Sequence, residues 1–137
     1  MMRFHWVAAS TLGVLLSTFP LAPQGRKAET TTVCAISREP AKFNSQWVRI
    51  PAHIESDSFE HTDIVDSACE GAGIELEYSS NFKGREELEK AIHSPSPGTV
   101  DKDISGVFIG RFQWHATERT RLILILNGVE SLKVVKK

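Results

Sequence analysis

The sequence contains only two cysteines and five histidines among its 137 residues, and none of them is spaced as CxxC or HxxxH. Compact zinc sites and thiol redox centres depend on such short spacings. The Gly71-Ala72-Gly73 segment is likewise no phosphate-binding loop, because no helix with a lysine follows it. We therefore expect no metal site, no cofactor and no catalytic residue that a motif would identify.

An excess of basic residues is also absent. Lys and Arg number 16, Asp and Glu number 17, and the formal net charge is −1. A nonspecific nucleic-acid binder needs a basic surface that displaces counterions from phosphates, so this charge balance disfavours nucleic acid as a partner. The remaining composition, 41% hydrophobic and 24% charged, is that of an ordinary globular chain with one domain.

No hydrophobic run is long enough to span a bilayer. The apolar segment from Trp6 to Leu16 is well short of the ~20 residues that a membrane helix needs. Arg3 precedes it and Pro20 and Pro23 follow it, which is typical of a cleaved signal peptide. We expect a signal peptide at residues 1–25, a flexible leader at 26–31 and one domain at 32–137, with no membrane span after cleavage.

Export determines how the two cysteines are interpreted. In the periplasm or outside the cell, an even pair of cysteines normally forms a disulfide, so we expect a Cys34–Cys69 bridge. Two inert buried thiols are one alternative. The other is chemistry, with a catalytic cysteine beside a histidine, or a metal site that uses His53, His61, His93 or His115.

The first part of the domain alternates most clearly. A helix should begin near Thr31 or Thr32 and end or restart at Pro40, and Asn44 should adopt the left-handed turn conformation. The strand that follows has two faces. Val48, Ile50, Ala52 and Ile54 should face the core, and Trp47, Arg49, Pro51, His53 and Glu55 should face outward.

Further elements follow from the same patterns. A helix starting at Asn81 or Gly84 has Leu88, Ala91 and Ile92 as its apolar stripe. Strands are expected over residues 59–66, 74–78, 106–115 and 122–126. Gly110 should mark a bend or a close backbone approach, and Asn127-Gly128 is either a hairpin turn or a bulge.

The expected class is mainly β with two short helices. A helix between the third and fourth of five strands is the arrangement of the OB-fold, a Greek-key barrel, here with an extra N-terminal helix. The runs VCAISREPAKFNSQWVRIPAHI, HTDIVDSACEGAGIELEY and GVFIGRFQWH resemble small exported bacterial proteins of uncharacterised function with an OB-like barrel. In that family a glycine stands where this chain has Ser45, and the resemblance implies no catalytic residue.

A noncatalytic extracytoplasmic binding module is the leading interpretation. Its partner would be a small ligand, a saccharide or a protein, because aromatic platforms beside a charged residue hold such ligands on barrels. The candidate ligand-binding residues are Trp47, Tyr78, Arg111, Phe112 and Trp114. The alternatives are a hydrolase or metal-dependent enzyme that uses His61, Asp63 and Asp66 with His53 or His115, and a purely structural envelope protein.

Overall fold

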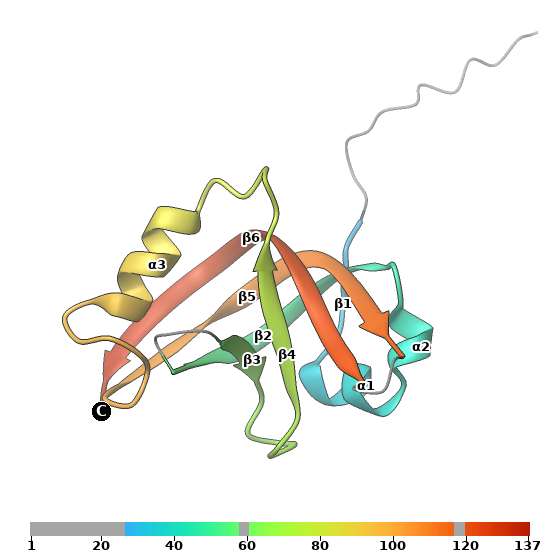
Figure 1. Cartoon of the computed structure of the whole chain (residues 1–137), viewed down its shortest axis with the longest axis horizontal. Helices are drawn as coiled ribbons and strands as arrows, with labels where there is room; N and C mark the ends of the chain where they lie inside the picture. Colours follow the sequence, from blue (N-terminus) through green and yellow to red (C-terminus); the bar gives the residue numbers. More distant parts are fainter. Residues whose placement is uncertain (1–26, 58–60, 117–119) are drawn as a thin grey trace, which may run out of the picture.

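The computed structural model describes residues 27–57, 61–116 and 120–137, and these are mainly β (Figure 1). The expected signal peptide, and Phe59 of the expected second strand, lie outside the described residues. The elements in chain order are β1 (Glu29–Thr30), α1 (Val33–Arg38), α2 (Pro40–Phe43), β2 (Trp47–Ser56), β3 (Thr62–Val65), β4 (Gly73–Tyr78), α3 (Arg85–His93), β5 (Lys102–His115) and β6 (Arg121–Lys136).

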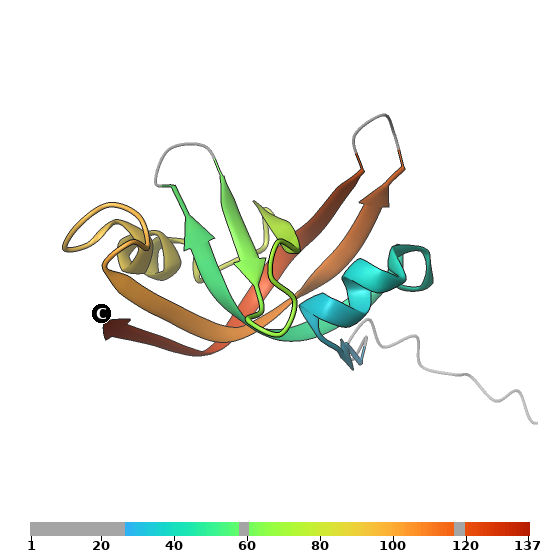
Figure 2. The same ribbon diagram turned by 90° about the horizontal axis from the view of Figure 1, so that it is seen from below.

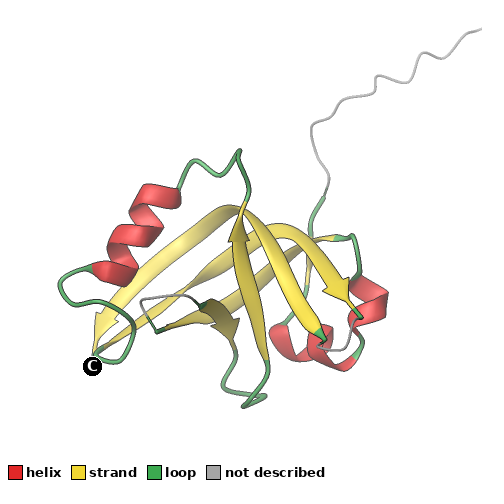
Figure 3. Ribbon diagram, in the orientation of Figure 1, coloured by secondary structure: helices red, strands yellow, loops and turns green. Residues whose placement is uncertain are grey.

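All six strands belong to one mixed sheet. Their order is β1-β2-β3-β4-β6-β5, and a further pairing of β2 with β5 closes the last five strands of the chain into a ring. Within the ring only the β4–β6 pair is parallel. In chain order α3 lies between the third and fourth strands of the ring, as the sequence predicts. The helices flank the sheet at two ends, with α1 and α2 at one and α3 at the other (Figures 2 and 3).

The described residues contain three short helices, where we expected two. Thr32 caps α1 as expected, since its hydroxyl oxygen accepts a hydrogen bond from the Ala35 amide at 3.0 Å. Pro40 then divides the expected N-terminal helix. It has no amide hydrogen to donate to a preceding turn, but it is well suited to the first position of the new helix α2.

The segment expected to be a flexible leader contains a short strand. Glu29 and Thr30 pair in parallel with Val48 and Arg49 of β2, and the Thr31 amide donates to the Arg49 carbonyl oxygen at 3.0 Å. The polar residues of this segment show no alternation that would predict a strand. The strand forms because its backbone pairs with the edge of β2.

The expected alternation of β2 is confirmed, and it builds the core. Val48, Ile50, Ala52 and Ile54 are at most 7% exposed, and they face a cluster in which Phe108 and Phe112 are completely buried. The stripe of α3 is confirmed for Leu88 and Ile92, which are each 1% exposed. Burial of these side chains is the main source of stability, at roughly 1.5–3 kcal/mol for each large apolar residue.

The two last strands are longer than the sequence suggested. β5 begins at Lys102 rather than Gly106, because Lys102, Asp103 and Ile104 pair with β6 beyond the part of β5 that pairs with β2. The buried Lys102 ammonium donates to the carbonyl oxygens of Ser94 and Ser96 at 3.0 and 2.7 Å, so a charged residue is tolerated inside this strand.

Asn127 is a bulge in one continuous strand, not a hairpin turn. Ile109 pairs with Gly128 and Gly110 pairs with Leu126, so Asn127 is the unmatched residue of β6. The left-handed turn residue before β2 is also one position later than expected. Ser45 has φ 65°, while the Asn44 side chain accepts a hydrogen bond from the Trp114 amide at 3.0 Å.

Gly110 makes the close backbone approach that its sequence position indicates. A Cβ built at this residue would overlap the carbonyl oxygen of Ile125 on β6. Gly128 sits in the same strand pair, yet a Cβ added there would meet no heavy atom within 4 Å. The two glycines therefore form a matched pair for mutation.

Gly110→Ala should lower the free energy of unfolding by about 2–4 kcal/mol, because the clash is with backbone and the strands must separate. Gly128→Ala should change it by no more than about 0.5 kcal/mol. Urea unfolding followed by circular dichroism measures both. Equal effects of the two substitutions would contradict the close approach at Gly110.

Candidate functional site: an acidic pocket on the outer face of the sheet

Alternation on three adjacent strands places acidic side chains on one outer face. Glu55 of β2 pairs with Asp63 of β3, and Asp63 pairs with Glu75 of β4, so these three carboxylates form a row across the sheet. Neighbouring strands lie about 4.8 Å apart, and like charges directly opposite one another are unfavourable. Arg121 neutralises one end of the row by binding both Glu75 oxygens at 3.0 and 3.1 Å.

The middle carboxylate has the least favourable environment. Burial raises the pKa of Asp63 above its usual value, and the negative charges of Glu75 and Glu55 raise it further, although His61 acts in the opposite direction. Asp63 therefore gains more than an isolated surface carboxylate would from a cation brought close to it.

A disulfide holds the loop that connects β3 to β4 beside this row. The expected bridge between Cys34 of α1 and Cys69 of the loop is present, with a Cα separation of 5.6 Å. Inside the loop the Cys69 amide donates to the Asp66 carbonyl oxygen, and the Ala72 amide donates to the Cys69 carbonyl oxygen. The loop is thus fixed both internally and to a helix outside the ring.

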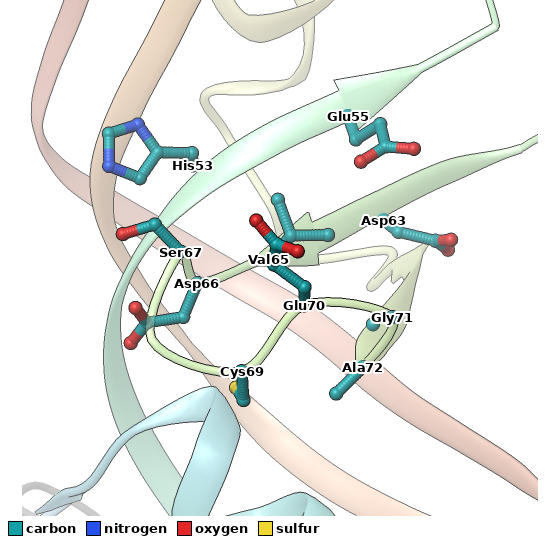
Figure 4. Close-up of a pocket in the computed structure, with 11 residues that line it drawn as sticks. His53, Glu55, Asp63, Val65, Asp66, Ser67, Cys69, Glu70, Gly71 and Ala72 are labelled. Atoms are coloured by element: carbon teal, nitrogen blue, oxygen red, sulfur yellow. The ribbon is translucent and has the colours of Figure 1, made fainter.

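The loop, together with Glu55 and Asp63 of the row, lines a pocket of about 580 Å³, which we call the acidic pocket (Figure 4). Val65, Cys69 and Ala72 provide apolar surface, and no Lys or Arg is among the described residues that line the pocket. In Figure 4, Glu55 and Asp63 lie on neighbouring strands at one end and His53 lies at the other. The polar lining residues on which the site depends are His53, Glu55, Asp63, Asp66 and Glu70.

His53 is oriented by an acid outside the acidic pocket. Its Nδ1 lies 2.8 Å from Oδ1 of Asp103 on β5, and both side chains are nearly half exposed. Because a carboxylate only accepts, Nδ1 carries the proton and Nε2 of the neutral ring is left as an acceptor.

Ser67 lines the same pocket, but it is not activated as a nucleophile. It forms no hydrogen bond with His53, and the adjacent Ala68 amide is already occupied by the Asp66 carboxylate at 2.9 Å. An oxyanion site next to Ser67 therefore lacks that donor. Among the described residues, no group of three or more His, Cys, Asp or Glu is arranged to hold a metal ion.

The five sequence-predicted binding residues do not share one surface. Trp47 and Arg111 pair directly between β2 and β5 and lie on the outer face. Phe112 is 0% exposed in the core, and Trp114 is partly buried against it. Tyr78 also packs on the core, where it stacks on Phe82 at 5.7 Å and lies 5.0 Å from the Arg85 guanidinium.

The residues of the alternative enzymatic interpretation are only partly brought together. His53, Asp63 and Asp66 line the acidic pocket, His61 does not, and His115 lies at the end of β5 opposite Arg121. Glu55 and Glu70 were not predicted as site residues. Alternation indicated the outward direction of Glu55, but the register that aligns it with Asp63 has no local sequence signal.

Searches against protein-family models, curated proteins and solved structures find no match to this chain. No helix within the described part of the chain has the length and apolar character needed to cross a membrane. The function of the acidic pocket is therefore inferred from its own geometry and charge.

Tyr78 provides a spectroscopic probe, because it is the single tyrosine of the sequence. Burial, followed by the negative charge of Glu89, raises its pKa to about 12. The pKa of tyrosine in the unfolded chain is about 10. Burial of the neutral phenol therefore contributes fully to the free energy of unfolding below pH ~10, and this contribution is lost as the pH rises towards 12. Tyrosinate absorbance should thus titrate near pH 12 or appear together with alkaline unfolding, and Tyr78→Phe should abolish the signal. A transition near pH 10 in the folded protein would contradict this burial.

The Cys34→Ser/Cys69→Ser double variant should lose about 3–4 kcal/mol of unfolding free energy, because the bridge closes a long loop in the unfolded chain. Denaturant unfolding measures the loss, and the native chain in excess dithiol reductant is the control that should match the variant. A loss below about 1 kcal/mol would show that the bridge does not constrain the fold in this way.

Proposed function

We propose that the chain is a noncatalytic extracytoplasmic binding module built on an OB-like, five-stranded Greek-key barrel. The barrel assignment is supported by the order of the five-stranded ring and by the position of α3 between its third and fourth strands. It also agrees with the resemblance of the sequence to small exported bacterial proteins. The extracytoplasmic location is supported by the signal-like segment at residues 1–25 and by the disulfide, which suits an oxidising compartment.

One observation carries the binding function, namely the acidic pocket beside a loop fixed by a disulfide. A preformed concavity with some apolar surface and several convergent polar groups is the usual form of a small-ligand site. Its charge defines the ligand, since Glu55, Asp63, Asp66 and Glu70 line it without a Lys or Arg among the described lining residues. The ligand is therefore a small or polymeric molecule that presents a cationic group.

A hydrolase that uses His53, Asp63 and Asp66 is the second candidate. The observation in its favour is the raised pKa of Asp63 in a pocket shared with His53, because a carboxyl with a raised pKa can act as a general acid. Binding is the better supported function, because Ser67 lacks a hydrogen bond to His53 and the neighbouring amide donor is occupied.

Titration of the isotope-labelled protein with lysinamide, chitobiose and glutamate, followed by amide chemical shifts, tests the binding function. Lysinamide should shift residues of the β3–β4 loop saturably, and glutamate should not. The Glu55→Gln/Asp63→Asn variant should bind lysinamide at least about tenfold more weakly, through loss of charged hydrogen-bond acceptors.

The matched control is Glu86→Gln/Glu87→Gln, which removes two exposed acids from the first turn of α3. Equal weakening by both variants would indicate net charge rather than the pocket, and no saturable shift with any of the three probes would overturn the binding function. The sample is purified from an exporting host. An intact mass that still includes residues 1–25 would contradict the extracytoplasmic location.

A further inference from the structure

A second hollow adjoins the acidic pocket on the outer face of the sheet. Its volume is about 420 Å³, and we call it the lysine pocket. The residues that characterise it are Pro51, His53, Asp66, Ser105, Gly106 and Lys133. His53 and Asp66 line both hollows, so the two concavities meet at these side chains.

One register row of the sheet runs through both concavities. Lys133 of β6 pairs with Ser105 of β5, Ser105 pairs with His53 of β2, His53 pairs with Val65 of β3, and Val65 pairs with Gly73 of β4. All five residues line one or both hollows. Ser105, Val65 and Gly73 have short side chains, and the row crosses the strands from one hollow to the other. We call the two joined hollows the furrow.

A bulge shapes the lysine end of the furrow. The register between β5 and β6 shifts between Ser105 and Val107, and Ser131 takes the left-handed conformation opposite this shift, with φ 55°. Gly106 lies at the bulge, where an added Cβ would come within 3.2 Å of the Glu130 carbonyl oxygen. Bulges redirect side chains at binding sites, and here the bulge lies beside Lys133.

His53 and Asp66 line both hollows, and the two ends of the furrow beyond these shared residues carry opposite charge. At the acidic end, Glu55, Asp63 and Glu70 form no ion pair within the described residues, and at the other end neither does Lys133. His53 lies between the ends with its Nε2 free to accept a hydrogen bond, because Asp103 holds Nδ1. A ligand that satisfies all three features has a cation at one end, an amide donor in the middle and an anion at the other end.

We propose that this furrow binds a short extended oligopeptide with free termini, its ammonium group in the acidic pocket and its carboxylate at Lys133. From β6 to β3 the row crosses three strand spacings, about 14 Å, which corresponds to about four residues of extended chain. The proposal rests on the binding function of the acidic pocket and specifies its ligand. A neutral saccharide would leave both charged ends unpaired.

Calorimetric titration with tetra-alanine in three forms tests the proposal: with free termini, with an amidated C-terminus and with an acetylated N-terminus. The free peptide should bind, and each blocked form should bind at least about fivefold more weakly, because each loses one charge-assisted contact. Lys133→Gln should weaken the free peptide to the level of the amidated peptide and leave the amidated peptide unchanged. Lys136→Gln, which removes the same charge from the same exposed strand end, should change neither.

The outcomes separate this proposal from the binding function on which it rests. Equal affinity for the free and amidated peptides, or no effect of Lys133→Gln, would overturn the peptide proposal, while lysinamide binding would still support the acidic pocket. Tighter binding of a chitin tetrasaccharide than of tetra-alanine would also overturn it in favour of a saccharide. Failure of lysinamide and all three peptides to bind would overturn both.

Discussion

The fold depends on β2 pairing along both of its edges. Residues 47–53 pair with β5 on one edge, and on the other edge residues 53–56 pair with β3. This double pairing turns an open sheet into a ring, and the inward faces of its strands surround the core. His53 belongs to both pairings. This residue of the candidate site therefore lies where the pairing of β2 changes from β5 to β3.

Closing a ring of only five strands requires the strands to bend and to approach one another closely. Gly110 allows β5 to pass against the Ile125 carbonyl, and the unmatched Asn127 shifts the register of β6 at the same level. A second register shift near Gly106 turns the ends of β5 and β6 away from the ring. The pocket beside Lys133 follows from this second irregularity, so the features that curve the sheet also shape its outer surface.

Local patterns predicted most of the elements, but they gave no indication of the acidic pocket, for one physical reason. The Thr32 cap, the alternation of β2, the α3 stripe and Gly110 are properties of neighbouring residues, which a sequence displays directly. The Cys34–Cys69 bridge was predictable because two cysteines allow one pairing. Register is different, since it depends on how strands that are distant in the sequence pair with one another. Glu55, Asp63 and Lys133 acquire a common site only through register, and the aromatic residues that seemed prominent, such as Phe112, were needed by the core.

The placement of charge is difficult to explain by stability alone. The chain is nearly neutral, with a net charge of −1, so its acids and bases could alternate across the sheet. Instead, Glu55 and Asp63 are direct neighbours on adjacent strands. The pKa of Asp63 is raised first by burial, then by the charge of Glu75, and to a smaller extent by the charge of Glu55. Arg121 forms an ion pair with Glu75 but not with Glu55 or Asp63. Lys133 lies on the other side of His53 from these carboxylates. A cationic group held at Asp63 would offset this unfavourable energy, so an arrangement that weakens the free protein favours the bound one.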